Sequence, residues 1–229
     1  THNWGEGYHS FLVDNGFIAA LSSPCVFHHQ DREIRLVVRG DDFTLVGPES
    51  SLDWFRKVIQ DQFEVKFKGR LGDGETQNQV RLLNRIIEYD QGKIRYEADQ
   101  RHAEIIVQEL GLGSNSNSVT TPGVKRQRPE HDKPLDKQQA TKYRALVARA
   151  LYLSQDRGDI QFAGKELARH MQAPTAHDWE GLKRLGRYLV GRERYVQWFE
   201  PHDDITQICV WVDSDHAGCG ETRKSTSGG

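Results

Sequence analysis

The sequence predicts a mixed α+β fold, and three features support this. Short apolar runs bounded by turn residues, typical of strands, alternate in the first half with segments whose apolar residues recur at helical spacing. A stretch rich in Gly, Ser, Asn and Pro, residues 111–137, then separates this half from a series of helical segments. Strand-like sequence returns near the end of the chain. This order is typical of an α+β protein in which a further unit begins close to the C-terminal end.

Composition limits the possible classes of protein. The 229 residues suffice for one large domain or two small ones, and 28% charged with 36% hydrophobic residues is ordinary for a globular protein. The formal charge of −2 gives no sign of a strongly basic nucleic-acid binder. Three cysteines without CxxC spacing argue against a disulfide framework or a zinc knuckle. No apolar run exceeds five residues and no leader opens the chain, so we expect an intracellular protein with no membrane partner.

The first part of the chain predicts one helix and two or three strands. The segment GYHSFLVDNGF has the spacing of a short helix, which Asn15-Gly16 would end. The expected strands are CVFHH (25–29), EIRLVV (33–38) and FTLV (43–46), with turns at Gln30-Asp31 and from Arg39 to Asp42.

A helix, a hairpin and a second helix are expected next. Residues 48–63 have an amphipathic pattern, and Ser50 with Asp53 makes a capping pair at the start. The apolar stripe of this helix consists of Trp54, Phe55, Val58, Ile59 and Phe63. The later elements are a hairpin of VRLLNRIIEYD (80–90) and KIRYEA (93–98), with its turn at Gln91-Gly92, and a helix at 99–110, which the glycines of GLGSN end.

Three helices and two strands are expected beyond the 111–137 linker. Apolar residues at helical spacing mark the helices, and the turn residues PHDD separate the strands. The helices are expected at about 138–155, 159–171 and 175–190, and the strands at RYVQWFE (194–200) and TQICVWVD (206–213).

Two adjacent carboxylates, Asp41 and Asp42, lie in the turn of IRLVVRGDDFTLVG. Gly and Asp are common in turns, so an ordinary hairpin tip is one interpretation. A divalent-metal site for phosphoryl transfer is the other, because hard cations prefer carboxylate oxygens and a rigid hairpin can hold two of them. A two-metal site also needs a third acidic group. The nearest upstream candidates, Asp14 and Asp31, lie in a predicted helix and a predicted turn and do not fit this role.

Two further sets of residues are candidates for function. Asp213 ends an apolar strand-like run, where a carboxylate is either a metal ligand or a solvated strand end. Lys183, Arg184 and Arg187 fall within one helical turn and either contact phosphates or form a solvated face. The same alternatives apply to a cluster in the linker, which consists of Lys125, Arg126 and Arg128.

Taken in order, these motifs resemble the polymerase region of a copia-type retrotransposon polyprotein. LVVRGDDFTLVG resembles the catalytic hairpin of its reverse transcriptase, usually written Tyr-x-Asp-Asp between apolar strands. VDSDHAGCGETRKSTSGG resembles the opening of its ribonuclease H domain. The colinear series covers roughly residues 11–229. The other resembling stretches are FRKVIQDQFEVKFKGRLG, LLNRIIEYDQGKIRYEADQRHAEIIVQELGL, VTTPG, YRALVARALYLSQDRGDIQFA and HDWEGLKRLGRYLVG.

The resemblance implies a fold and a division of the chain. The expected fold is a partial reverse-transcriptase palm with β-hairpins, thumb-like and connecting helices, and then the first strands of a ribonuclease H-like fold. The implied parts are a partial palm and thumb-like region (1–110), a linker (111–137), a helical connection (138–193) and a truncated ribonuclease H-like start (194–229).

The resemblance also implies an activity, which is RNA-directed DNA polymerisation by two-metal nucleotidyl transfer. Asp41 and Asp42 would bind Mg²⁺ at the polymerase site, and Asp213 would bind Mg²⁺ at the hydrolytic site. The implied partners are an RNA template, a DNA primer and deoxynucleotides. The residues expected to contact nucleic acid are Arg39, Lys183, Arg184 and Arg187.

Departures from the family pattern set the remaining expectations. Arg39 stands where the family has Tyr, and Gly158 stands where it has Pro. The family's first metal-binding Asp and its later ribonuclease H acids would lie outside the 229 residues, and the sole methionine is Met171. We therefore expect a piece of a longer protein, without polymerase activity on its own. The alternatives are a non-catalytic remnant or adopted nucleic-acid-binding module, and an α+β domain with an ordinary hairpin.

Overall fold

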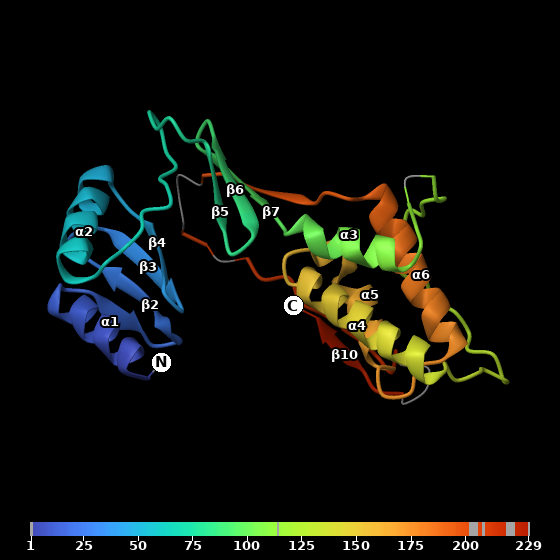
Figure 1. The fold of residues 1–229 in the computed structure, drawn as a ribbon. Coiled ribbons are helices and arrows are strands. Elements are labelled where there is room, and N and C mark those ends of the chain that lie inside the picture. Colours follow the sequence, from blue (N-terminus) through green and yellow to red (C-terminus); the bar gives the residue numbers. More distant parts are fainter. Residues whose placement is uncertain (1, 114, 202–205, 208, 219–222, 229) are drawn as a thin grey trace. The chain divides into compact units, whose positions relative to one another are not determined.

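The computed structural model describes residues 2–113, 115–201, 206–207, 209–218 and 223–228 (Figure 1). These residues form six helices, two antiparallel four-stranded sheets and a two-stranded sheet, which confirms the mixed α+β class. The chain divides into two compact units, residues 1–68 and 69–229. None of the helices in the described part of the chain combines the length and apolar character needed to cross a membrane.

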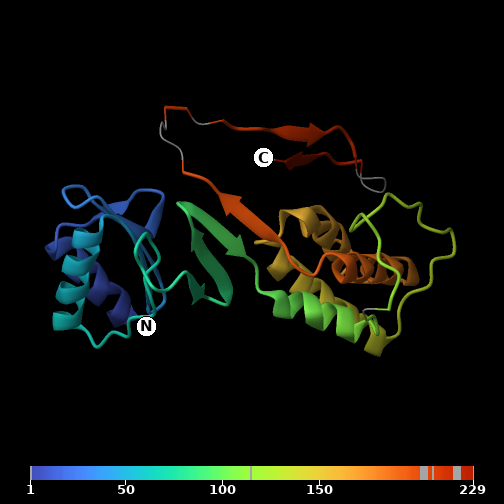
Figure 2. The same cartoon turned by 90° about the horizontal axis from the view of Figure 1, so that it is seen from above.

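The first unit is one antiparallel sheet with two helices on one of its faces, as Figures 1 and 2 both show. Its strands are joined consecutively in the order β1-β2-β3-β4. Alternation along β3 buries Ile34, Leu36 and Val38 against the helices and leaves Arg35, Val37 and Arg39 exposed. The elements are α1 (His2–Asp14), β1 (Ile18–Ala20), β2 (Ser23–His29), β3 (Ile34–Arg39), β4 (Asp42–Val46) and α2 (Glu49–Gln62).

Most predictions for this unit are confirmed. The helix ends before Asn15 and Gly16, three predicted strands are present, and the stripe of α2 packs into the core through Phe55 and Ile59. Strand β1 was not predicted. The capping pair is wrong, because Pro48 precedes the helix and its carbonyl accepts from the Ser51 and Leu52 amides, which places Ser50 inside the first turn.

The second unit contains a second antiparallel sheet and a bundle of four helices. The sheet order is β5-β6-β7-β8, and the described strands β9 and β10 pair separately. The elements are β5 (Gln79–Leu82), β6 (Arg85–Asp90), β7 (Lys93–Glu97), α3 (Gln100–Glu109), α4 (Lys137–Ser154), α5 (Gly158–Ala168), α6 (Ala176–Gly191), β8 (Val196–Phe199), β9 (Asp213–Asp215) and β10 (Thr226–Gly228).

Two differences from prediction concern this sheet. The segment 80–90 is two strands rather than one, because Leu83 and Asn84 have φ values of 49° and 68° and form a tight turn. Strand β8 pairs with β7, with Val196 opposite Glu97, and lies beside it as the orange arrow in Figure 2. It does not pair with the described residues of the segment 206–213. The described residues 206–207 and 209–212 are not in a strand, and the Trp211 side chain in this segment is 83% exposed.

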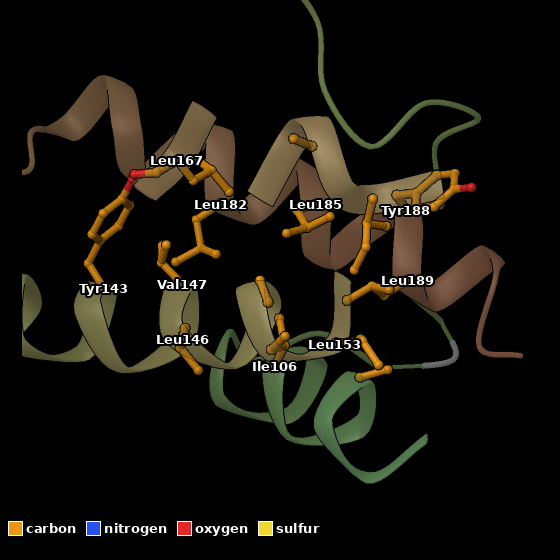
Figure 3. Packing of buried hydrophobic residues seen from close by; sticks show 14 of the residues in the cluster. Ile106, Tyr143, Leu146, Val147, Leu153, Leu167, Leu182, Leu185, Tyr188 and Leu189 are labelled. Atoms are coloured by element: carbon orange, nitrogen blue, oxygen red, sulfur yellow. The ribbon is translucent and has the colours of Figure 1, made fainter. Parts of the chain in front are cut away.

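The three helices predicted beyond the linker are confirmed, and together with α3 they have a continuous apolar core (Figure 3). Leu146 and Leu153 from α4 belong to the same buried cluster as Leu182 and Leu185 from α6, together with residues of α3 and α5. The helix starts match prediction because they are locally encoded: Asp99 and Asp136 side chains accept from the backbone, and Thr175 with Asp178 forms a capping box.

Candidate metal site at the β3–β4 hairpin

The turn between β3 and β4 consists of Gly40 and Asp41. Arg39 pairs directly with Asp42 across the two strands, so only two residues connect them. Gly40 has a φ of 66°, whereas Asp41 is not among the described residues with positive φ. Positive φ at the first central residue is typical of a type II′ turn, which favours glycine at that position. The sequence Arg-Gly-Asp-Asp is therefore compatible with a tight turn that carries both carboxylates.

The two carboxylates have different surroundings. Asp41 is exposed in the turn, and Asp42 is the first residue of β4, with its side chain 24% exposed. The Lys68 ammonium group donates to Oδ1 of Asp42. Arg39, directly across the ladder, is exposed and lies on the same face of the sheet as Asp42. The hairpin end thus has two acids and two bases.

An aromatic cluster around Trp4 contacts the turn. The indole Nε1 of Trp4 in α1 donates to the Gly40 carbonyl at 2.9 Å. The Trp4 ring also makes edge contacts with Tyr8, Phe43 and Phe63, at centroid distances of 5.9, 6.3 and 5.3 Å. These contacts join α1, β4 and the residue after α2, and the indole links them to the carbonyl of the turn.

The predicted basic cluster on α6 makes contacts within the chain. Lys183 pairs with Glu180 at 3.0 Å. The Arg184 guanidinium donates to the Thr121 hydroxyl at 2.7 Å, and that of Arg187 donates to the Asn117 carbonyl at 2.7 Å. Both arginines therefore hold the 111–137 segment against α6, and their role toward phosphates stays a prediction.

The linker cluster makes the reciprocal contacts. Arg126 donates to the His177 carbonyl at 2.8 Å, and Arg128 pairs with Asp178 at 2.9 Å and with Asp132 at 3.0 Å. A cavity of about 410 Å³ lies beside these groups at the start of α6, lined by Arg126, Pro129, His131, Asp132, Lys133, Ala176, His177 and Glu180. Burial, together with the charges of Arg126 and Arg128, lowers the pKa of His177.

The linker and the end of α3 approach α6 closely at two glycines. A Cβ at Gly186 would lie 2.6 Å from Cδ1 of Leu110 and 2.8 Å from Cδ1 of Leu112. A Cβ at Gly191 would lie 2.8 Å from that of Ser118. The linker is therefore packed along this helix in the structure, although its described residues before Lys137 form no helix or strand beyond one isolated bridge at Pro134.

Comparison with known proteins gives three informative relatives. The chain is 23% identical over 236 residues to the retrovirus-related Pol polyprotein from transposon TNT 1-94 of Nicotiana tabacum, which covers 98% of this chain. It is 32% identical over 88 residues to the retrovirus-related Pol polyprotein from transposon RE2 of Arabidopsis thaliana. The resemblance to copia-type retrotransposon Pol polyproteins is confirmed. An uncharacterized mitochondrial protein of Arabidopsis thaliana, AtMg00810, is 34% identical over 86 residues.

The similarity to Pol polyproteins concerns a region of them. The chain spans 17% of the tobacco Pol polyprotein, 6% of the RE2 Pol polyprotein and 35% of AtMg00810, and the latter two matches cover 38% of the chain. No family model matches the chain, and no solved structure matches it.

The acidic residues that the Pol resemblance implies are only partly brought together. No group of three or more His, Cys, Asp and Glu side chains suited to a metal ion occurs among the described residues. Asp14 ends α1 and Asp31 lies in a turn, as expected. Asp213 begins β9, where its backbone pairs with Gly228, but its side chain lies outside those described. Among the described side chains, the acids of this candidate site are therefore the two carboxylates of the hairpin, Asp41 and Asp42.

Sequence reasoning missed two residues at the hairpin, Trp4 and Lys68. Trp4 is 36 positions from Gly40, and Lys68 is 26 positions from Asp42. Neither belongs to a motif, and both contacts depend on how α1 and the segment after α2 fold back onto the sheet. A regular pattern in the chain could not have indicated them.

Proposed function

We propose that this chain is part of the RNA-directed DNA polymerase of a retrotransposon Pol polyprotein, with Asp41 and Asp42 as ligands of Mg²⁺ in nucleotidyl transfer. One observation carries the proposal: a two-residue turn presents these two carboxylates where the sequence resembles the Tyr-x-Asp-Asp hairpin. The proposed partners are an RNA template, a DNA primer and deoxynucleotides.

The donor set fits a hard divalent cation. Asp41 and Asp42 offer carboxylate oxygens, which Mg²⁺ prefers, and at least one of them is exposed at the turn. A bound Mg²⁺ would stabilise charge on the attacking and leaving oxygens of the transferred phosphoryl group. Two carboxylates leave most of the coordination shell to water, so binding to this hairpin would be weak.

Other residues of the hairpin have supporting parts in the proposal. Gly40 permits the tight turn, and the Trp4 indole donates to its carbonyl, which would help to hold the carboxylates in place. Arg39 is exposed beside Asp42 and is placed to attract a nucleic-acid phosphate. The proposal extends to Asp213 as the first carboxylate of a ribonuclease H-like site.

Metal binding at the hairpin is the direct test. Mn²⁺ replaces Mg²⁺ at carboxylate sites and broadens NMR signals of nearby amides through its unpaired electrons. In the ¹⁵N-labelled chain, we expect Mn²⁺ at low millimolar concentration to broaden the amides of residues 39–43 first. The effect should disappear when Asp41→Asn and Asp42→Asn are combined.

The matched control is Asp61→Asn, which removes an exposed carboxylate on α2. This variant should keep the broadening at the hairpin. Equal broadening of all exposed acidic positions, or none at residues 39–43, would contradict the proposal.

A further inference from the structure

We infer that Lys68 is an internal counter-cation of the hairpin site, which occupies Asp42 in the absence of metal and competes with a divalent ion for that carboxylate. The inference rests on the proposed function, because it concerns the same two acids. Its basis is the ion pair from the Lys68 ammonium group to Oδ1 of Asp42. It gives Lys68 a part in regulating metal occupancy.

Packing of the segment after α2 onto the core places Lys68 close to Asp42. After α2 ends, the backbone is extended at Phe63, and both Phe63 and Val65 pack onto the core of the first unit. The Phe63 ring lies 5.1 Å from that of Phe11 and 5.3 Å from that of Trp4. The Phe67 ring is covered by the Arg56 guanidinium at 4.1 Å. The contacts of Phe63, Val65 and Phe67 hold this segment against the first unit, so that Lys68 lies beside the end of the hairpin.

The negative charges of the two aspartates favour a cation beside Asp42. Asp41 and Asp42 are neighbours in sequence and repel each other when both are ionised. Asp41 has no ion-pair partner among the described residues, so the pair at Asp42 and the nearby Arg39 offset the negative charge. A lysine at this position reduces that repulsion while it occupies Oδ1 of Asp42, an oxygen that a metal ion would otherwise use.

The pair is also weak enough to be displaced. The Lys68 side chain is 55% exposed and that of Asp42 is 24% exposed, so water screens their attraction. Exposed ion pairs of this kind change equilibria by a factor of up to about five. Because the lysine stem is flexible, its ammonium group can move into solvent when a divalent ion binds. Removal of Lys68 should therefore strengthen metal binding by a measurable but small factor.

The experiment compares Lys68→Gln with Lys66→Gln by Mn²⁺ titration of the ¹⁵N-labelled chain. Both variants lose one exposed positive charge, two positions apart, but only Lys68 has a described contact with Asp42. The apparent Kd from broadening of residues 39–43 should fall about two- to fivefold in Lys68→Gln. It should change less in Lys66→Gln, and Lys68→Arg should remain close to the unmodified chain.

The outcomes separate the two ideas. Binding at the hairpin with the same Kd in all variants, or an equal decrease in Lys66→Gln and Lys68→Gln, would overturn the role of Lys68 and leave the metal site standing. Absence of hairpin broadening in every protein would overturn the metal site and the role of Lys68 with it. Thermal unfolding of each variant checks that the exposed substitutions leave the fold unchanged.

Discussion

Asp156 joins the second sheet to the helical bundle, and its replacement by Asn gives the sharpest test of the packing. It accepts from Nε of Arg85 at 2.9 Å and from the Tyr96 hydroxyl at 2.6 Å. The Arg85 and Asp156 side chains are only 11% and 10% exposed. Burial and the hydrogen bond to Asp156 raise the pKa of Tyr96 to about 12. This carboxylate therefore neutralises a nearly buried guanidinium and orients a tyrosine.

The expected loss of stability follows from that burial. Removal of one partner from a buried ion pair costs about 3–5 kcal/mol, because the other charge remains without compensation. The amide introduced by Asp156→Asn would retain one oxygen acceptor, and the site is slightly exposed, so we expect a loss of about 2–4 kcal/mol. With a urea m-value of about 2 kcal/mol/M, the unfolding midpoint should fall by roughly 1–2 M.

The assay is urea unfolding, together with a spectrophotometric titration of tyrosine. The pKa of Tyr96 should fall in Asp156→Asn, because the carboxylate that raises it is gone while Arg85 remains. Asp73→Asn is the matched control, since Asp73 accepts from the Tyr89 hydroxyl at 2.8 Å in an exposed pair. It should leave the midpoint nearly unchanged. Equal midpoints for the two variants would refute the reasoning.

Four further outcomes are expected. Gly40→Ala should destabilise the hairpin by about 1–2 kcal/mol, measured by chemical unfolding, because alanine rarely adopts a φ of 66°. The hydrogen bonds from Arg194, and then from Gln100, lower the pKa of Glu97 despite its burial. The ionised Glu97 carboxylate therefore stabilises the fold, and this contribution is lost as the pH falls below about 4.5. In Glu97→Gln, the free energy of unfolding should decrease less steeply in this acidic range, measured by unfolding at several pH values. The isolated chain should give no Mg²⁺-dependent primer extension; extension that Asp41→Ala abolishes would contradict this. Any binding to an RNA–DNA duplex should weaken with salt and with Arg39→Gln, measured by fluorescence anisotropy; salt-independent binding would argue against phosphate contacts.

Helices could be predicted from the sequence because their signals are local. The starts of α3 and α4 follow capping aspartates, and the stripe of α2 has regular spacing. The turn at Gln91-Gly92 is also recognisable, since both residues have positive φ, 48° and 82°, and the second is glycine. By contrast, Leu83-Asn84 makes a similar turn without glycine, so the sequence pattern predicts a single strand where the structure has two.

The candidate site could be predicted only as far as its hairpin. The two apolar runs and the Gly-Asp pair between them indicated a hairpin with two acids at its tip, and in the structure Asp41 lies in the turn and Asp42 begins β4. The cation on Asp42 and the indole on the turn carbonyl come from distant positions, which no spacing rule encodes. The same limit applies to Arg184 and Arg187, whose charges suggested phosphates although their described contacts are with the linker.

The pairing of β8 joins the end of the helical bundle to the second sheet. Residues 196–199 complete the sheet that starts at Gln79, and Gln197 donates to the Asp156 carbonyl at 2.7 Å. The ion pair between Lys93 and Glu200, at 2.6 Å, extends the same association. A strand so engaged cannot use that edge for another sheet. Strands β9 and β10 pair with each other and not with this sheet.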